Sequence, residues 1–238
     1  MKILGIDTST HSTSVCIIED EKLICEYTVN TKKTHSQKLM VMIESMIKES
    51  DLNIKDIDSI AICIGPGSFT GLRISMATAK AIAQVRNLPI IAVNSLESLA
   101  FNMNLCDKII CPILDAQRNQ VYTGKYKFES GQFKTIEDIK VIEIEELIEE
   151  LSNKNEDFIL VGEATILYKE KLEPIKNIHV ASVSNNVSKA SSLCAIGAIK
   201  YNNDKDVYNC YTVNPMYIRK SQAEVQYEEK MKRLENDK

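Results

Sequence analysis

Two aspartates follow apolar stretches that predict β-strands, and both could hold a metal ion or a phosphate. Asp7 lies in the segment IDTST, residues 6–10, beside the hydroxyl groups of Thr8 and Ser9. Asp115 ends a second apolar stretch in the same way. A carboxylate with neighbouring hydroxyls can hold hydrated magnesium or the terminal phosphate of a nucleotide. Asp, Ser and Thr are also common turn residues, so one such turn is weak evidence. Two matching turns on facing domains predict a nucleotide cleft of the actin type.

A glycine-rich segment, GPGSFTGLR at residues 65–73, offers a second kind of phosphate chemistry. It follows an apolar stretch and precedes a predicted helix, whose N-terminal N–H groups attract anions. Leu72 stands where a P-loop has lysine, the glycine spacing is not G-x-G-x-x-G, and Pro66 lacks an N–H donor. Both a vestigial phosphate loop and a tight turn that packs the helix on its sheet remain open. The candidate residues of this loop are Gly65, Gly67, Ser68 and Gly71.

The first half of the chain has the periodicity of a mixed sheet carrying helices. Thr34 and Gln37 fit a capping box, in which Thr34 is the N-cap of a helix of about 15 residues. The expected strands are 3–6, 14–19, 23–30, 59–64 and 90–93. The expected helices are 34–50, 68–86 and one that starts at 95.

A second block begins near residue 107 and repeats the order of apolar strand, aspartate, polar turn and strand. The expected strands are 109–114, 121–128, 158–161 and 178–181, and the expected helices are 143–151, 165–172 and 187–201. The repeated order predicts two duplicated α/β domains, at residues 1–105 and 106–218, each with a mixed sheet. Residues 219–238 are highly charged and are expected to form a solvated tail.

Other kinds of reactive site have weaker support. The histidines His11, His35 and His179 are not spaced as a metal-binding pair, and there is no H-E-x-x-H. Ser68 and Thr70 have no histidine near them in sequence, which disfavours a self-sufficient hydrolase. The seven cysteines include no C-x-x-C pair and are typical of reduced thiols in a cytoplasmic protein. We therefore predict neither a metal centre nor a catalytic nucleophile.

The composition limits the classes of partner. The net charge is −4, whereas nucleic-acid binders usually carry a basic excess. No apolar run reaches the length of roughly 18–20 residues that a membrane span needs, and the N-terminus lacks the apolar region of a signal peptide. We expect a cytoplasmic protein without membrane contact, which meets RNA through another subunit if at all.

Four segments together resemble one family, the TsaB (YeaZ) family, over residues 1 to about 224. They are GPGSFTGLR, IDTST, LDAQRNQVY and PMYIRKSQAE. The resemblance implies an actin/hexokinase-like (ASKHA) fold and a role in making threonylcarbamoyladenosine at position 37 of tRNA. It also implies a catalytic partner, TsaD, an accessory ATPase, TsaE, and a homodimer when the partner is absent. ATP and magnesium would then belong to the assembled complex, and this chain would be a non-catalytic activating subunit.

The two long helices of the first half carry more apolar surface than one packed face requires. Methionines on the first helix and alanines on the second suit a helical interface, and the resemblance implies that these helices meet TsaD or a second copy. The candidate interface residues are Leu39, Met42, Met46, Thr70, Arg73 and Met76. Ordinary core packing between the two helices is the alternative. If the interface is correct, Met46→Glu or Met76→Glu should leave the monomer folded and abolish co-purification with the partner. The rival functions are an ATP-dependent small-molecule kinase or ATPase and a homodimeric structural protein.

Overall fold

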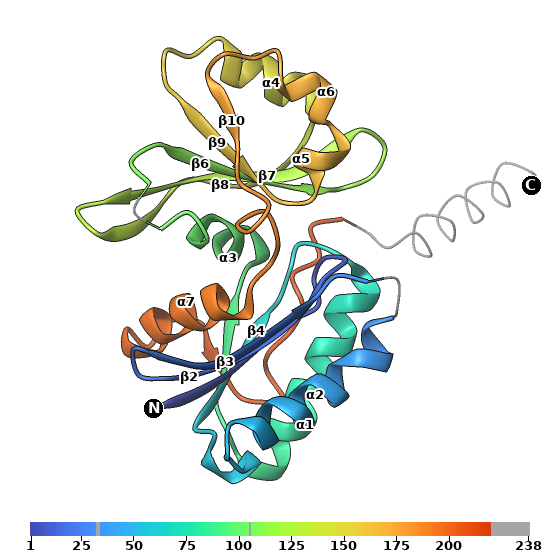
Figure 1. Ribbon diagram of the computed structural model, residues 1–238, viewed down its shortest axis with the longest axis vertical. Coiled ribbons are helices and arrows are strands. Elements are labelled where there is room, and N and C mark those ends of the chain that lie inside the picture. The colour runs from blue at the N-terminus through green and yellow to red at the C-terminus, as the bar shows by residue number, and fades with distance from the viewer. Residues whose placement is uncertain (32–33, 105, 220–238) are drawn as a thin grey trace, which may run out of the picture.

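The computed structural model describes residues 1–31, 34–104 and 106–219, which form two lobes, each built on one β-sheet (Figure 1). The first sheet has the order β11-β5-β4-β1-β2-β3. Strands β1, β2 and β3 form an antiparallel meander. Strand β4 pairs parallel with β1, and β5 pairs parallel with β4. The strands of this sheet are β1 (Lys2–Asp7), β2 (Thr13–Glu19), β3 (Lys22–Val29), β4 (Ser59–Cys63), β5 (Ile90–Val93) and β11 (Val207–Tyr208).

The second sheet repeats this plan in the order β10-β9-β6-β7-β8. Strand β6 pairs antiparallel with β7 and parallel with β9, as β1 pairs with β2 and β4. The predicted duplication and the α/β class of the fold are therefore confirmed by strand order. The strands are β6 (Ile109–Asp115), β7 (Gln120–Glu129), β8 (Gln132–Glu143), β9 (Phe158–Val161) and β10 (Ile178–Val180).

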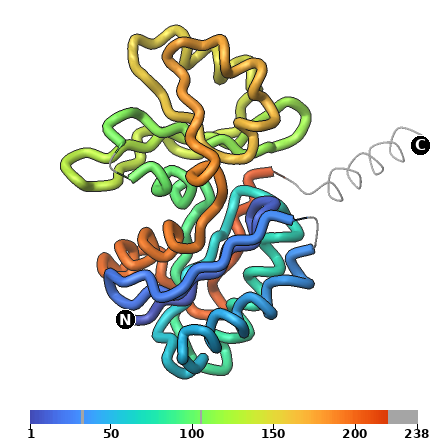
Figure 2. Tube along the Cα trace, in the orientation of Figure 1, coloured from blue at the N-terminus to red at the C-terminus, as the bar shows by residue number. Residues whose placement is uncertain are grey.

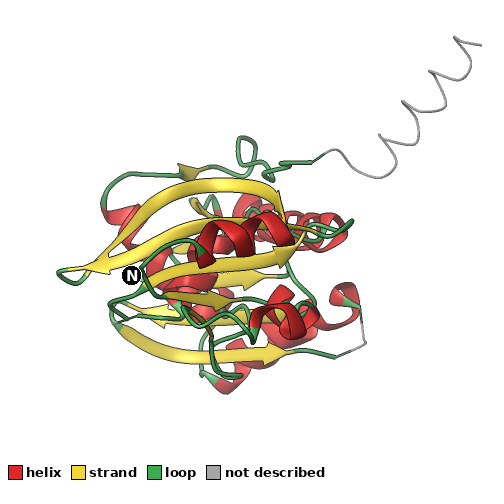
Figure 3. Cartoon of the chain, turned by 90° about the horizontal axis from the view of Figure 1, so that it is seen from above, coloured by secondary structure: helices red, strands yellow, loops and turns green. Residues whose placement is uncertain are grey.

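Helices cover both faces of the first sheet (Figure 1), and Figure 3 shows the strands and helices of the two lobes from above. Helices α1 and α2 contact one face, while α7 contacts β1, β2, β4 and β5 from the other. Helix α3 lies between the lobes and contacts both α7 and the second sheet. The helices are α1 (His35–Glu49), the short 3-10 helix η1 (Ile54–Asp56), α2 (Phe69–Arg86), α3 (Ser95–Phe101), α4 (Ile144–Ser152), α5 (Ala164–Leu167), α6 (Lys169–Leu172) and α7 (Ala190–Asn202).

The end of the described chain returns to the first lobe, as the trace in Figure 2 shows. Helix α7 packs on the first sheet, and β11 pairs with β5. A division at residue 105 would therefore separate α7 and β11 from the sheet on which they pack. The domain limits at 1–105 and 106–218 stay a prediction, and of the predicted tail at 219–238 only Arg219 lies within the described residues.

The first sheet is buried on both faces because apolar side chains alternate on its central strands. On β1, Leu4 and Ile6 pack in the cluster beneath α1 and α2, whereas Ile3 packs beneath α7. Alternate side chains of a strand point to opposite faces, so a strand covered on both sides is apolar throughout. Among the helices in the described part of the chain, none combines the length and apolar character of a membrane span.

The helix boundaries agree closely with the local signals. The side chain of Gln37 accepts a hydrogen bond from the Thr34 N–H at 3.3 Å, as expected for the capping box that begins α1. Ser68 caps α2 by accepting from the Gly71 N–H at 3.2 Å. Asn87 ends α2 in the left-handed conformation, with φ of 53°.

Several features differ from the expectation. Strand β8 was not predicted, because its sequence QFKTIEDIKVIE carries charges along a largely exposed edge strand. The short strand β11 was also missed. The helix expected at 165–172 is two short helices, which meet at Tyr168, where φ is −108°.

Candidate functional site

The two aspartates singled out in the sequence occupy equivalent turns at the ends of β1 and β6. The Oδ1 atom of Asp7 accepts hydrogen bonds from the backbone N–H of Ser9 at 2.8 Å and from its hydroxyl at 2.7 Å. The Oδ1 atom of Asp115 accepts from the backbone N–H of Gln117 at 2.8 Å. Each carboxylate thus closes its own turn two residues further along the chain.

The two carboxylates differ in their exposure to solvent. Asp7 is 1% exposed, and its Oδ2 atom is buried without a hydrogen-bond partner in the described residues. Burial raises the pKa of Asp7, although the hydrogen bonds from Ser9 and from the Cys63 thiol oppose the shift. Asp115 is exposed. Asp7 therefore presents no accessible carboxylate to a ligand in this conformation.

The glycine loop packs against the turn that follows Asp7. Thr8 donates its hydroxyl to the Gly71 carbonyl at 2.7 Å, and the Ser68 N–H donates to the Ser9 carbonyl at 2.7 Å. A Cβ atom at Gly67 or Gly71 would overlap the carbonyl oxygen of Ser9 or Thr8 respectively. Because these backbones approach so closely, the glycines serve contact between the loop and the turn. The geometry favours the tight-turn alternative over a phosphate cradle.

A third carboxylate joins this region from the second lobe. The His11 N–H donates to the Oε2 atom of Glu163 at 3.3 Å, which links the β1–β2 turn to the start of α5. Burial, and then the nearby carboxylates of Asp115 and Asp7, raise the pKa of Glu163. Sequence reasoning missed Glu163. The available signal was its place directly after Gly162 and β9, which mirrors the glycine loop after β4.

The residues around the two aspartate turns and the glycine loop do not form the kind of Mg-ATP site that this class of fold would use. Asp7 is covered, and the Ser68 N–H that could face a phosphate is already donated. Within residues 1–31, 34–104 and 106–219, no three His, Cys, Asp or Glu side chains are grouped so that they could hold a metal ion. The vestigial nucleotide loop stays a prediction, and we derive no step through a bound nucleotide.

Four of the six candidate interface residues lie inside the chain, which corrects the sequence-based assignment. Leu39, Met42, Met46 and Met76 are buried in the cluster between α1, α2 and the first sheet. The wide apolar surface of these helices is therefore covered largely by their own sheet and by each other, as the core-packing alternative stated. A charge at Met46 or Met76 would be buried, so those variants cannot be expected to leave the monomer folded.

The other two candidates, Thr70 and Arg73, are exposed at the start of α2. The Arg73 guanidinium lies over the ring of Phe69, 3.9 Å from its centroid, and its Nε donates to the Tyr217 hydroxyl at 3.1 Å. The rings of Phe69 and Tyr217 are 4.8 Å apart. Residues 209–219, which we call the C-terminal segment, are held here by these contacts.

The C-terminal segment also connects the two lobes. The N–H of Met216 donates to the Ile64 carbonyl at 2.7 Å, directly before the glycine loop. The guanidinium of Arg219 donates to the Ala116 carbonyl, directly after Asp115. The segment thus joins the start of α2 to the β6–β7 turn.

Two mixed sheets of matching strand order, with paired aspartate turns where the lobes meet, define an actin/hexokinase-like (ASKHA) protein. The family model described as TsaD, tRNA N6-adenosine threonylcarbamoyltransferase, matches residues 23–227. The tRNA threonylcarbamoyladenosine biosynthesis protein TsaB of Bacillus subtilis is 31% identical over 234 residues, 98% of this chain and 100% of that protein. The chain therefore belongs to the TsaB (YeaZ) family, as its four motifs predicted.

Further matches agree with this family. TsaB of Escherichia coli is 30% identical over 166 residues, covering 68% of this chain and 71% of that protein. The solved structure of YeaZ from Pseudomonas aeruginosa superposes with a TM-score of 0.77 at 21% identity, covering 91% of this chain and 99% of that one. At that identity the structural match supports the fold alone.

Proposed function

We propose that this chain acts in the biosynthesis of threonylcarbamoyladenosine in tRNA, as a non-catalytic subunit that binds and activates a TsaD-type transferase. Membership of the TsaB family supports the pathway, because the relatives carry that biosynthesis in their names. The match to the TsaD family model indicates that partner and chain share one fold. Subunits of one fold can pair through equivalent faces, as the halves of an isologous dimer do.

The observation that carries the proposal is a set of exposed apolar residues on the neighbouring helices α1 and α2. Met40 is 54% exposed, Val41 60% and Val85 86%. Ala77 and Ala81 are exposed on α2 between Arg73 and Val85, at spacings of four residues. These positions replace the buried methionines as the surface available to a partner. We propose that these residues belong to one binding surface, and we call the five residues Met40, Val41, Ala77, Ala81 and Val85 the outer helix face.

The chemistry of the outer helix face suits another helix. Alanine side chains let two helices approach closely, and residues spaced by four form a ridge that packs into a groove. Thr70 and Arg73 would supply a polar rim at the start of α2. A stable complex needs an interface of roughly 1,600 Å² in total, so further contacts around this face are expected.

Charge variants on the outer helix face test the proposal. Ala81→Glu and Val85→Glu should leave the fold intact, since both residues are exposed, and should weaken binding to the TsaD-type subunit at least about tenfold. Val183→Glu is the matched control, because Val183 is 93% exposed in the second lobe. Binding would be measured by calorimetry with both purified subunits. Equal affinity of all three variants and the natural chain would contradict the proposal.

The second candidate function is an ATP-dependent small-molecule kinase or ATPase. It rests on the matched turns at Asp7 and Asp115, which resemble the phosphate-binding turns of the fold class. The burial of Asp7 argues against it. Calorimetric titration of the isolated chain with Mg-ATP separates the two functions. We expect no binding in the micromolar range, and micromolar binding with turnover would favour the kinase or ATPase.

Other features of the family remain predictions for this chain. They are a TsaE-like ATPase as a further partner, a homodimer in the absence of the transferase, tRNA contact only through the complex, ATP and magnesium in the assembled complex, and a cytoplasmic location. Reconstitution of tRNA modification with and without this chain tests the activating role. Modification by the transferase alone at the full rate would contradict it.

A further inference from the structure

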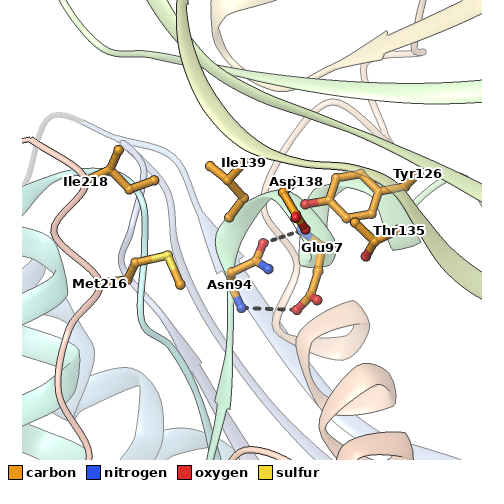
Figure 4. A pocket seen from close by; sticks show the side chains of 8 residues that line it. All are labelled: Asn94, Glu97, Tyr126, Thr135, Asp138, Ile139, Met216 and Ile218. Atoms are coloured by element: carbon orange, nitrogen blue, oxygen red, sulfur yellow. Dashed lines mark hydrogen bonds between the residues drawn. The ribbon is translucent and has the colours of Figure 1, made fainter.

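A pocket of about 380 Å³ lies where the two lobes and the C-terminal segment meet (Figure 4). It is separate from the outer helix face and from the aspartate turns. We call it the interlobe pocket. Its lining residues are Asn94, Glu97, Tyr126, Thr135, Asp138, Ile139, Met216 and Ile218.

Three parts of the chain build the interlobe pocket. Asn94 and Glu97 belong to the start of α3, where Asn94 Oδ1 accepts from the Glu97 N–H at 2.7 Å and Glu97 Oε2 accepts from the Asn94 N–H at 3.4 Å. This reciprocal capping fixes both side chains. Strand β7 supplies Tyr126, and β8 supplies the carboxylate of Asp138. The C-terminal segment supplies Met216 on the opposite side (Figure 4).

The pocket carries one carboxylate that the described chain does not neutralise. Glu97 is paired with the Lys200 ammonium at 2.9 Å, and that ammonium also binds Asp206 at 2.9 Å. Asp138 is exposed and forms no ion pair within the residues that the structure describes. Burial, and then the carboxylates of Glu97 and Asp138, raise the pKa of Tyr126 above its ordinary value of 10.0, so its phenol is neutral at pH 7 as in any tyrosine. The polar side of the pocket therefore offers one free negative charge beside neutral hydrogen-bonding groups.

The other side of the pocket is apolar. Figure 4 shows Met216 and Ile218 on one side, Ile139 in the middle, and Tyr126 with Asp138 across from them. A ligand that fills this space needs one cationic end for the carboxylate and an aliphatic body for the apolar side. Asp138 would repel an anion, and a neutral apolar molecule would gain no charge-assisted hydrogen bond from it.

We propose that the interlobe pocket binds a small organic cation, in which one ammonium or guanidinium group is carried on a short aliphatic stem. The volume is at the lower end of small-molecule sites, so the ligand is about the size of an alkylamine. The cation would bond to Asp138, and the stem would lie against Met216, Ile139 and Ile218. This inference does not depend on the proposed function, because the pocket residues lie outside the outer helix face.

The test uses the full chain and two probes of the same shape, pentylammonium and the neutral 1-pentanol. Backbone amide shifts of Asn94, Asp138 and Ile139 are followed by NMR during each titration. We expect saturable shifts with pentylammonium, at a dissociation constant in the low millimolar range, and at least about tenfold weaker binding of 1-pentanol.

Two variants make the result specific to the pocket. Asp138→Asn should weaken pentylammonium binding about tenfold, whereas Asp51→Asn, which removes an exposed carboxylate after α1, should leave it unchanged. Thr135→Lys places an ammonium at the exposed edge of the pocket and should abolish binding by occupying the site. The proposal is overturned if pentylammonium gives no saturable shifts up to roughly 50 mM. It is also overturned if 1-pentanol binds equally well, or if Asp138→Asn binds as the natural chain does.

Discussion

The two lobes share one strand order but differ in what surrounds their sheets. In the first lobe, two long helices cover one face and α7 covers the other. In the second lobe, the helices that follow β8 and β9 are shorter, and β8 is largely exposed. Exposed apolar residues occur in both lobes, but Ile166 and Leu167 lie on a helix of four residues. Only a long helix offers a continuous ridge to a partner helix, which is why we assign the interface to the first lobe.

The same contrast appears in the paired turns. The turn after β1 is covered by the glycine loop, which buries Asp7, whereas the corresponding Asp115 is exposed. The turn after β6 instead holds three consecutive residues with positive φ, from Gln117 at 62° to Asn119 at 59°. In both turns the aspartate accepts a hydrogen bond from the N–H two residues further on, but the residues that surround the two aspartates differ. The comparison shows that both turns keep the hydrogen bond from the backbone to the aspartate, whereas only one of the two aspartates is accessible to a ligand.

The largest expected effect on stability comes from placing a charge in the core of the first lobe rather than on the surface of its helices. Met46→Glu places a carboxylate at a fully buried position and should lower the free energy of unfolding by about 3–5 kcal/mol. Val85→Glu, at an exposed position on α2, should change it by less than about 0.5 kcal/mol. Urea denaturation of both variants checks this. Similar free energies of unfolding for the two variants would show that Met46 or Val85 has been assigned wrongly to the core or the surface.

Next in size is the contact between the glycine loop and the Asp7 turn. Gly71→Ala would force its Cβ against the Thr8 carbonyl and should cost about 3 kcal/mol of stability. Gly131→Ala is the control in the second lobe, where no atom lies within 4 Å of the added Cβ and φ is 77°. It should cost about 1 kcal/mol, from the left-handed backbone alone. A harmless Gly71→Ala, measured by thermal denaturation, would contradict the close packing of the loop on the Asp7 turn.

The second lobe contains an ion-pair network of two lysines and two glutamates, which is larger than the group of Lys200 with Glu97 and Asp206 beside the first sheet. The ammonium of Lys125 is 2.6 Å from Glu137 and also bonds to Glu150, and Lys140 is 2.7 Å from Glu150. Burial would raise the pKa of Glu150, but hydrogen bonds from Lys125 and Lys140 outweigh it and lower the pKa to about 2. A lowered carboxyl pKa stabilises the fold above its ordinary value near 4.5, and this contribution is lost as the pH falls toward 2.

Glu150→Gln should therefore lower the free energy of unfolding at pH 7 by about 1–3 kcal/mol. The difference from the natural chain should shrink as the pH falls from 4.5 toward 2, because both proteins then lack the charge. Chemical denaturation at a series of pH values measures this. A difference that is constant with pH would show that the network contributes through packing rather than charge.

The smallest effect compares the two aspartates directly. Because burial raises the pKa of Asp7, its charged form above that pKa costs stability, and the cost disappears as the pH falls. Asp7→Asn keeps the Oδ1 acceptor and should raise the free energy of unfolding at pH 7 by about 1 kcal/mol. Asp115→Asn should change it by less than about 0.5 kcal/mol. Loss of stability in Asp7→Asn at every pH would mean that the hydrogen bonds from Ser9 and the Cys63 thiol outweigh the cost of burying the charge.

Much of the fold follows from local signals in the sequence. The alternating strands of the first lobe, the capping box at Thr34 and the repeated order around Asp7 and Asp115 were all predicted and are confirmed. Strand β8 could not be predicted from its charged sequence, because its pairing with β7 comes from the sheet and not from its own periodicity. The family was predicted from four motifs and is confirmed by the comparisons.

The site was harder to predict, because exposure depends on tertiary contacts. A helical wheel shows that α1 has a wide apolar face, but not that its own chain covers Met42 and Met46 while Met40 stays exposed. Glu163 was missed because it reaches His11 only through the packing of one lobe on the other. Sequence patterns thus predicted the two apolar helices but assigned buried side chains to their surface.

Hydrogen exchange of this chain, alone and with the TsaD-type subunit, tests the central claim most directly. The account predicts that the amides of α1 and α2 become slower to exchange in the complex, while those of α4, α5 and α6 are unchanged. Protection that is confined to the second lobe, or a complex that protects neither long helix, would contradict the assignment of the partner surface to the first lobe.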